Sequence, residues 1–592
     1  MRWYIKENKR AIACENFEGH RDDVEMSGEQ VSGVIGYAVN DGILKIERLV
    51  ICPLFRTHPD VTQSSYKVRF DENFIGIENE QFERVEFDGT LSLFTFTQDL
   101  SIKHVIYPST TLPIFYERIE IENKTDKEIS LVFEKYRRIK TSLCCKGYVY
   151  TEIIADRESF TVGARSKETV TFGIYTRFAN KENELEEDSL ARRYKRVNEL
   201  MSACDVTTGD DVIDTMFSFA KLRAGESVFK TSAGRVHSPG GTNYYAAIWC
   251  NDQSEYSTPW FAFTGDEILN EAVKNALDWF EPYMNDEYLP IPSSIISEAT
   301  DFWNGAGDRG DASMFLYGNS RYFLTIGQLP DPKRQKMLDW CAEYIVRHIG
   351  EDGVVISDTD ELENRLSSGV NLNTSCLSYG ALGYYAMILK KQGRISEAEK
   401  YLEIREKLKK SINEYFSENI KGYDTYAYHK GCGEIRAWTC LPIYMGITDR
   451  KEGVVSSIDE NLWIEGGLAS TEGEKIMWDR STLYYIAALF RGGYTELGFK
   501  RLKEYCLTRL LGERVPYAVE AYPEYNMRHL SAESALFCRA IIDGLLLMDQ
   551  GQDGAQINCV LPKKIEQILV ENIFIDGKYK SFKIRGGVST EL

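Results

Sequence analysis

The residues 181–202, KENELEEDSLARRYKRVNELMS, separate two parts of the chain that have different sequence patterns. Acidic residues come first in this stretch and basic residues follow, which is the order of charge that a helix dipole favours. The stretch therefore predicts a linker helix within residues 181–205. Before it the chain consists of short β-prone runs, and after it the apolar residues recur at helical spacing.

Residues 1–180 are rich in β-prone runs that are joined by turn residues, as in β-hairpins. Several short strands with regular turns are typical of a large sandwich, so we expect an antiparallel β-sandwich here. Three hairpins are predicted: Val31–Asn40 with Ile43–Cys52 around Asp41-Gly42, Arg84–Phe87 with Thr90–Phe96 around Asp88-Gly89, and Ile119–Glu122 with Ile129–Phe133.

The chain after the linker is predicted to be helical. Asp331 and Pro332 are typical of a helix start, and Met337, Trp340 and Tyr344 share one face of the helix that follows. Twelve helices are expected, near residues 210–226, 254–264, 266–283, 311–326, 332–349, 374–392, 396–417, 434–445, 450–460, 480–492, 496–511 and 531–548.

Twelve helices in consecutive pairs suit a closed (α/α)6 toroid, which we expect over residues 206–550. The tail, residues 551–592, returns to β-prone runs with a hairpin around Asp576-Gly577, which predicts a short C-terminal β segment. The predicted fold class is therefore a multidomain α and β protein.

Composition excludes several classes of partner. The formal net charge is -20, and an acidic surface repels nucleic acids and anionic membranes. No apolar run is long enough to span a membrane, and the N-terminus lacks a signal peptide's apolar core. The 13 cysteines show no zinc spacing and the seven histidines form no close pair. We expect a cytoplasmic protein with reduced thiols, no catalytic metal and no cofactor; the oligomeric state, a homo-oligomer included, is left open.

The first of four loops that combine acids with aromatic residues is 234–256. Its glycines match neither of the common phosphate-binding motifs. Asp252 and Glu255 are three residues apart, which places them on one helix face, and packing beside Trp249 raises a carboxyl pKa as a general acid requires. Glu255 is the first candidate acid and Asp252 the second, with helix capping as the alternative role of Asp252. Trp249 is a predicted substrate contact.

The second loop, 301–313, holds two aromatic residues and several acids among glycines. Trp303 offers an apolar face for a sugar ring, with ordinary loop packing as the alternative. Asp308 and Arg309 are predicted to bind the substrate, and Asp311 to cap the following helix.

The third loop, 358–365, and a smaller fifth cluster at 478–481 are more charged than aromatic. Residues 358–365 have the composition of a solvated turn, from which Arg365 is nevertheless a predicted substrate contact. Asp479 and Arg480 follow Trp478 and are predicted to pair with each other in a structural role.

The fourth loop, 513–530, precedes the last helix and holds two glutamates among tyrosines. Glu520 is the first candidate for a catalytic base and Glu524 is the second. Tyr522 and His529 are predicted substrate contacts. Glu533 lies in the first turn of the following helix, where we expect it to stabilise the helix dipole.

These motifs resemble the six-hairpin glycosidases, which include α-L-rhamnosidases, the amylo-α-1,6-glucosidase domain of glycogen debranching enzymes, and cellobiose and maltose phosphorylases. Asp252-Gln253-Ser254-Glu255, followed by Thr264-Gly265-Asp266, is similar to the rhamnosidase pattern of Asp-Glu-Arg before Trp-Thr-Gly-Asp, although Tyr256 replaces the arginine and the gap is longer. The resemblance implies that Glu255 is the general acid and that Glu520 or Glu524 is the base.

The resemblance implies an inverting, exo-acting glycoside hydrolase that cleaves oligosaccharides or glycosides. A phosphorylase of the same architecture is the first alternative, with a basic cluster of Arg235, His237, Arg528 and His529 to hold phosphate. A polysaccharide lyase is less favoured, because lyases usually place the helical domain first. A non-catalytic carbohydrate-binding protein is the remaining alternative, and the density of acids in the loops argues against it.

Overall fold

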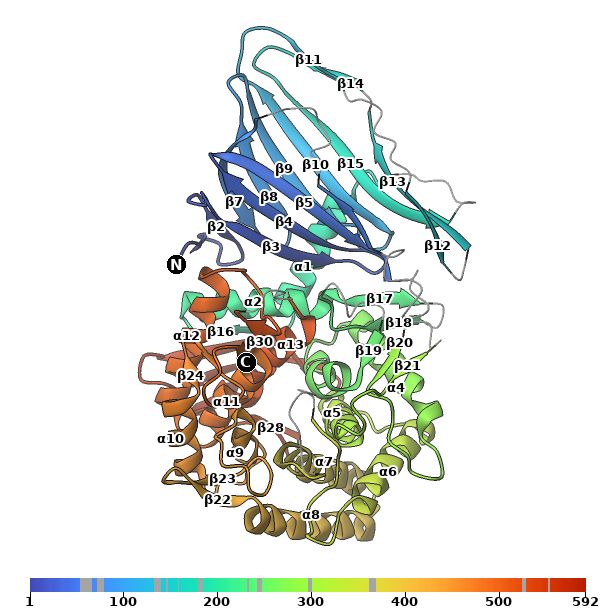
Figure 1. The fold of residues 1–592 in the computed structure, drawn as a ribbon, viewed down its shortest axis with the longest axis vertical. Helices are drawn as coiled ribbons and strands as arrows, with labels where there is room; N and C mark the ends of the chain where they lie inside the picture. The colour runs from blue at the N-terminus through green and yellow to red at the C-terminus, as the bar shows by residue number, and fades with distance from the viewer. Residues whose placement is uncertain are drawn as a thin grey trace.

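The computed structural model describes the chain except for residues 54–66, 72–78, 133–139, 145–146, 158, 179–184, 232–233, 242–246, 297–300, 361–368, 524–528 and 552–553. Figure 1 shows a β-sheet part, formed by the N-terminal residues, above a helical part. Helix α1 (Ser189–Ser202) lies between the two parts, inside the range predicted for the linker helix.

The N-terminal strands form an antiparallel sheet that contains 13 strands within the described residues. Ten of them follow one another in the order β12 (Lys140–Cys144), β13 (Gly147–Ala155), β15 (Lys167–Phe178), β10 (Ile114–Asn123), β9 (Leu100–Pro108), β8 (Leu91–Phe96), β7 (Gln81–Phe87), β5 (Ile43–Ile51), β4 (Ser32–Asn40) and β3 (Arg21–Ser27). The short strands β1 (Tyr4–Ile5), β2 (Ile12–Cys14) and β6 (Lys67–Phe70) pair beside this path.

This sheet folds back on itself, so its two halves pack face to face without being two separate sheets. Strands β3 and β4 contact β9, which is several strands away in the sheet order. Arg48 of β5 and Glu117 of β10 form a buried ion pair with Nε to Oε2 at 2.6 Å. His104 of β9 bridges Glu117 and Glu80 from the same interior. A polar cluster thus joins the two halves.

Two of the three predicted hairpins in this part are confirmed. Asp41 and Gly42 have φ of 53° and 74° between β4 and β5, as a tight hairpin turn requires, and β7 pairs with β8. The third was wrong: β11 (Ile129–Val132) pairs with β14 (Ser159–Val162) and not with β10. Both edges of β10 are already occupied, by β9 and β15.

The helical part contains these elements: α2 (Asp211–Glu226), η2 (Asn251–Ser257), α3 (Thr258–Phe261), α4 (Glu267–Phe280), α5 (Asp311–Ile326), α6 (Pro332–Arg347), α7 (Leu372–Lys391), α8 (Ile395–Tyr415), η5 (Ala437–Cys440), α9 (Leu441–Tyr444), α10 (Lys451–Asn461), α11 (Asp479–Arg491), α12 (Thr495–Leu511), α13 (Ser531–Arg539) and η6 (Ala540–Leu545). Most of them lie within about three residues of the predicted ranges.

The contacts between the inner elements run in a closed circuit. Element η2 contacts α5, α5 contacts α7, α7 contacts α9, α9 contacts α11, α11 contacts α13, and α13 returns to η2. We call these elements, together with α3 and η6, the inner circuit. The remaining helices pack outside it: α4 on α3, α6 on α5, α8 on α7, α12 on α11 and α2 on α13.

Three predicted inner helices are not simple α-helices. The helix expected at 254–264 begins earlier, as the π-helical turn η2 that continues into α3. The helix expected at 434–445 is the short 3-10 turn η5 followed by α9. The helix expected at 531–548 changes from α13 into the π-helical turn η6. Such π turns are rare and occur frequently at functional sites.

The C-terminal strands complete the helical part. The sheet order is β16 (Asp205–Thr207), β30 (Gln567–Ile575), β31 (Lys578–Arg585) and β32 (Val588–Glu591). The predicted hairpin is confirmed, with Asp576 and Gly577 at φ of 52° and 74°. The amide of Phe574 donates to the carbonyl of Phe263 beyond α3, at 2.9 Å. The end of the chain therefore pairs with the strand that directly follows α1.

None of the described helices is long and apolar enough to cross a membrane. Eleven cysteines have side chains that the structure describes; all of them are buried, and they form no disulfide with one another.

Candidate functional site

The π-helical turn η2 carries Asp252 and Glu255 into the centre of the inner circuit. Gly318 of α5 makes this approach possible, because a Cβ at this position would lie 1.5 Å from the carbonyl oxygen of Ser254. Every residue of η2 is buried. Both predicted candidate acids therefore lie inside the protein, on one short turn that is pressed against α5.

Glu255 is fully buried and is held from two sides. Its Oε1 accepts a hydrogen bond from the hydroxyl of Tyr484 in α11. Its backbone carbonyl accepts from Nη1 of Arg539 in α13 at 2.5 Å. Burial raises the pKa of the Glu255 carboxyl to about 7, against the opposing effects of Tyr484 and Arg539. This carboxyl thus retains its proton close to neutral pH.

Arg480, in the first turn of α11, pairs with Glu533 and not with its neighbour Asp479 as predicted. Its Nε and Nη2 donate to Oε1 of Glu533 at 3.0 and 2.5 Å. Burial, with the charges of Asp252 and Glu520, raises the pKa of Glu533 to about 8 although Arg480 opposes the shift. Glu533 lies in the first turn of α13, as predicted, but it is also fully buried, and the charges of Asp252 and Glu520 act on it.

Asp479 instead positions the segment that carries Glu520. Its carboxylate pairs with Arg509, with Nη2 to Oδ1 at 2.5 Å, and accepts from the amide of Val519 at 2.8 Å. The strands β26 (Met477–Trp478) and β27 (Ala521–Tyr522) pair on the other side of Glu520. Glu520 is only half-buried. It is therefore more exposed than the other three carboxyl groups of the site, those of Asp252, Glu255 and Glu533, which are buried.

Trp249 and Trp303 form an aromatic pair beside η2. The strands β19 (Ala247–Trp249), β20 (Ser294–Ile296) and β21 (Phe302–Trp303) form a small sheet in which both tryptophans are in register with Ser294. Alternate strands at one register present side chains to one face, and the two rings lie 5.4 Å apart at 51°. Both are half-buried, so their remaining surface is open to a ligand.

Two other predicted substrate contacts support the protein itself. Arg309 is 1% exposed, and its guanidinium donates to Ser293, Asn251 and Asp311 while lying 5.7 Å from the Trp249 ring. Arg309 thus contacts both η2, through Asn251, and the tryptophan pair, through Trp249. Asp311 starts α5 as the partner of Arg309, and Gly310 occupies the cap position that was predicted for Asp311.

Asp308 is also buried, and its carboxylate accepts from the hydroxyl of Tyr344 at 2.7 Å and from the amide of Gly310 at 2.8 Å. Burial raises its pKa. These contacts position the loop before α5 rather than a sugar.

The histidines of the predicted basic cluster are buried and neutral. Burial lowers the pKa of His237 and of His529 to about 3. His237 contacts the hydroxyl of Ser531 at 2.9 Å, and His529 donates to the carbonyl of Arg514 at 3.0 Å. His529 is therefore placed as a support of the 513–530 loop and not as a substrate contact.

Arg235, from the same predicted cluster, already pairs with Glu29 and Glu271, at 3.1 and 2.7 Å. Tyr522 lies at the edge of the site, half-buried, with the Arg509 guanidinium 4.5 Å from its ring. Glu524, Arg365 and Arg528 fall outside the described residues.

The structure therefore gathers four carboxyl side chains around Arg480 of α11: two from η2, one from α13 and one from the segment before β27. The sequence pattern missed Glu533 and Tyr484. The signal was present, because Glu533 lies in the largely apolar run SAESALFCRAIIDGLLL, and charges within buried helices are paired or functional. Two carboxyls that stay protonated near neutral pH beside a more exposed one are suited to general acid and base catalysis.

The fold is similar to those of several solved proteins. A putative kojibiose phosphorylase from the human microbiome superposes with a TM-score of 0.58 at 13% identity, covering 100% of this chain and 98% of that chain. A bacterial glucoamylase complexed with acarbose gives 0.55 at 11% identity, covering 90% and 97%. A GH78 family rhamnosidase of Bacillus sp. GL1 gives 0.51 at 10% identity, covering 87% and 53%. No protein-family model and no curated protein sequence matches the chain.

Proposed function

We propose that the chain is an inverting, exo-acting glycoside hydrolase that cleaves oligosaccharides or glycosides. In this proposal residues 206–550 form an (α/α)6 toroid, and the closed circuit of inner contacts supports it. The observation that carries the function is the convergence of buried, protonated carboxyls from η2 and α13 with the more exposed Glu520, around Arg480.

Glu255 is the proposed general acid. Its pKa of about 7 lets it hold a proton at neutral pH and donate that proton to the glycosidic oxygen as the bond to the anomeric carbon breaks. Glu520 is the proposed base, because its carboxylate is the most accessible of the four to water. It takes a proton from the water that attacks the opposite face of the anomeric carbon. Inverting enzymes separate these two carboxyl groups by about 6.5–9.5 Å.

Trp249 and Trp303 are the proposed platform for the sugar ring. Their rings are paired, half-buried and adjacent to η2, and a pyranose has apolar C–H faces that pack on aromatic rings. Tyr522 lies on β27, two residues after the proposed base, and pairs with Met477. The substrate is thus expected to lie between the tryptophan pair and the segment before β27.

The test compares Glu255→Gln and Glu520→Gln with Glu287→Gln, an exposed glutamate outside the site. We expect both site variants to lose about 10²–10⁴ in kcat on a panel of glycosides while the control stays within twofold. For dinitrophenyl glycosides, whose leaving group needs no acid, the loss of kcat in Glu255→Gln is expected to be small. Azide is expected to restore the activity of Glu520→Gln. Near-normal turnover by both site variants overturns the assignment.

Asp252 is the rival acid, since it lies on the same turn and its charge acts on both Glu255 and Glu533. The leaving-group test separates the two. If Asp252→Asn, and not Glu255→Gln, recovers on dinitrophenyl substrates, Asp252 is the acid. Proton NMR of the first-formed anomer tests inversion independently of either residue.

A phosphorylase of the same architecture is the second candidate, supported by the overlap of the whole chain with the putative kojibiose phosphorylase. Against it, His237 and His529 are neutral and Arg235 is already paired, so three of the four cations proposed for phosphate are engaged elsewhere. Cleavage that requires inorganic phosphate and releases a sugar 1-phosphate would establish the phosphorylase; cleavage at full rate without phosphate establishes the hydrolase.

A further inference from the structure

A cavity of about 370 Å³ lies at the end of α11 opposite to Arg480. Two of its lining residues, Tyr317 and Tyr444, accept hydrogen bonds from Arg539, which also donates to the carbonyl of Glu255. The cavity is formed where the C-terminal ends of α7, α9 and α11 meet β28 (Met548–Gly551). Helix α11 connects the cavity with the carboxyl cluster, since Arg480 is in its first turn and Arg491 is its last residue. At 1.5 Å per residue these two arginines are about 16 Å apart along the helix, so the cations of the cavity are distinct from the arginine of the carboxyl cluster.

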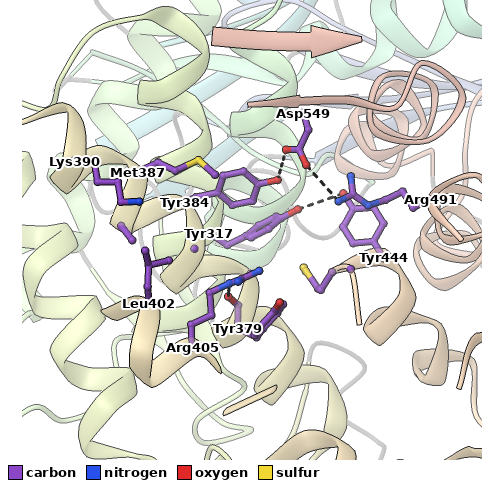
Figure 2. Close-up of a pocket in the computed structure, with 15 residues that line it drawn as sticks. Tyr317, Tyr379, Tyr384, Met387, Lys390, Leu402, Arg405, Tyr444, Arg491 and Asp549 are labelled. Carbon is purple, nitrogen blue, oxygen red and sulfur yellow. Dashed lines mark hydrogen bonds and ion pairs between the residues drawn. The ribbon is translucent and has the colours of Figure 1, made fainter. Parts of the chain in front are cut away.

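The charge of this cavity is opposite to that of the protein. Among its lining residues Lys390, Arg405 and Arg491 are cations, and Asp549 is the one acid. The chain as a whole carries a formal net charge of -20. Figure 2 shows the three cationic side chains placed around the tyrosines of the cavity. A concentration of positive charge in an acidic protein attracts anions.

Arg491 has unused hydrogen-bonding capacity inside the cavity. Its side chain is 20% exposed and its closest acid is Asp549, with Nη2 to Oδ2 at 3.5 Å. Within the described residues its guanidinium donates no hydrogen bond, and Nε is buried without an acceptor. A guanidinium has five N–H donors, and buried donors are normally satisfied. An anion in the cavity would satisfy them.

Arg405 is brought to the cavity by a glycine. Its Nε donates to the carbonyl of Tyr379 at 3.2 Å, and its guanidinium lies 3.8 Å from the Tyr379 ring. A Cβ at Gly383 of α7 would lie 2.9 Å from this Nε. Glycine inside a helix is less favourable than alanine, so α7 is weakened at the position where the arginine crosses it.

Lys390 completes the set from the last turn of α7. It is half-buried and forms no ion pair within the described residues. Tyr384 and Asp549 add polar groups beside Arg491, where the tyrosine hydroxyl donates to Oδ1 of Asp549 at 2.9 Å. The cavity therefore combines cationic groups that can bind an anion with polar groups that can bind hydroxyls.

We propose that this cavity binds a small phosphorylated sugar. The phosphate contacts Lys390, Arg405 and Arg491, and the sugar hydroxyls bond to Asp549 and Tyr384. A volume of about 370 Å³ is near the lower end for ligand sites, which suits a monosaccharide phosphate better than a nucleotide. The proposal stands on the residues of this cavity and is independent of the proposed catalytic function.

The test is isothermal titration of the full chain with glucose 1-phosphate, glucose 6-phosphate, glucose and inorganic phosphate. Lys390→Glu is the variant and Lys391→Glu is its control, because Lys391 is the exposed next residue and the change in net charge is the same. We expect a hexose phosphate to bind wild type and the control alike, and Lys390→Glu at least tenfold more weakly. Lys390→Gln and Lys391→Gln repeat the comparison if the charge reversal disturbs folding.

Three results overturn the proposal: no binding of either hexose phosphate at millimolar concentration, equal weakening by the Lys390 and Lys391 changes, or equal affinity for inorganic phosphate and the hexose phosphates. The last of these identifies a site for the anion alone. Because Glu255→Gln and Glu520→Gln lie outside the cavity, a failure here leaves the glycosidase test unaffected.

Discussion

The hydroxyl of Tyr484 in α11 donates a hydrogen bond to Oε1 of Glu255 in η2. Burial raises the pKa of Glu255 to about 7, and this hydrogen bond opposes that shift because it favours the ionised form. Tyr484 therefore tunes the proposed acid without contacting the substrate, and its effect can be separated from that of Glu255 through the pH dependence of the reaction.

Tyr484→Phe is expected to raise the pKa of Glu255 further. The protonated acid is the active form, so kcat/KM of the wild type should decrease as the pH rises through about 7. In the variant this alkaline limb should move to higher pH, as pH–rate profiles will measure. Tyr485→Phe is the control, since Tyr485 contacts the carbonyl of Val455 instead. A limb that stays in place or moves to lower pH contradicts the role of Tyr484.

Trp303→Ala is expected to raise KM about tenfold, equivalent to about 1.4 kcal/mol, with little change in kcat. Stacking on a sugar stabilises the ground state and the transition state alike. Trp303→Phe should retain most of the affinity. Phe302→Ala is the matched control, because successive strand residues point to opposite faces and Phe302 packs on Tyr283. Initial rates on the best substrate give the values; an equal KM effect at both positions contradicts the platform.

Asp543→Asn is expected to lower the free energy of unfolding by about 3–5 kcal/mol, because it leaves buried cations without their partner. Asp543 accepts hydrogen bonds from Arg321, Arg539 and Tyr444, and these cations hold its pKa well below the usual range against the effect of burial. Urea denaturation will measure the change. The control is Asp549→Asn, whose side chain is 44% exposed and which should change stability by at most about 1 kcal/mol.

His104→Gln is expected to destabilise the sheet part in a pH-dependent way. Burial alone lowers the pKa of His104, but Glu117 and Glu80 outweigh it and raise the pKa to about 9. Because the folded pKa lies above the unfolded value of about 6.5, the stabilisation is complete below that value and is lost as the pH rises through about 9.

The difference in thermal midpoint between wild type and His104→Gln should therefore be large at pH 6 and small at pH 9.5. His20→Gln, at an exposed histidine, is the control. A difference that grows with pH would show that His104 is neutral in the folded protein.

Features that depend on local conformation were predictable from the sequence. Asp41-Gly42 and Asp576-Gly577 supply the positive φ values that tight hairpins need. The helix at 311–326 begins and ends as predicted because its apolar spacing and the glycines at both ends are local signals. The pairing of β11 was missed because the sequence does not show that both edges of β10 are already taken.

The candidate site was only partly predictable, since its contacts join distant segments. Arg480 was expected to pair with the adjacent Asp479, but the fold brings Glu533 to it from α13. The π-helical shape of η2 depends on Gly318 of another helix. The sequence also does not show which loop residues are buried. Arg309 and His529 are buried and support neighbouring segments, although they come from the same type of loop as the more exposed candidates.

The hydrogen bonds between β16 and β30 also impose an order on the events of protein synthesis. The described strands of the N-terminal sheet have all been synthesised once residue 178 is made, so that part is free to fold as soon as it has left the ribosome, while translation continues. Strand β16 follows soon after, but its partner β30 is made several hundred residues later, after α13, which closes the inner circuit against η2. The nascent helical part therefore exposes apolar faces for most of its synthesis, and a product terminated before Gln567 would combine a folded sheet with an aggregation-prone remainder.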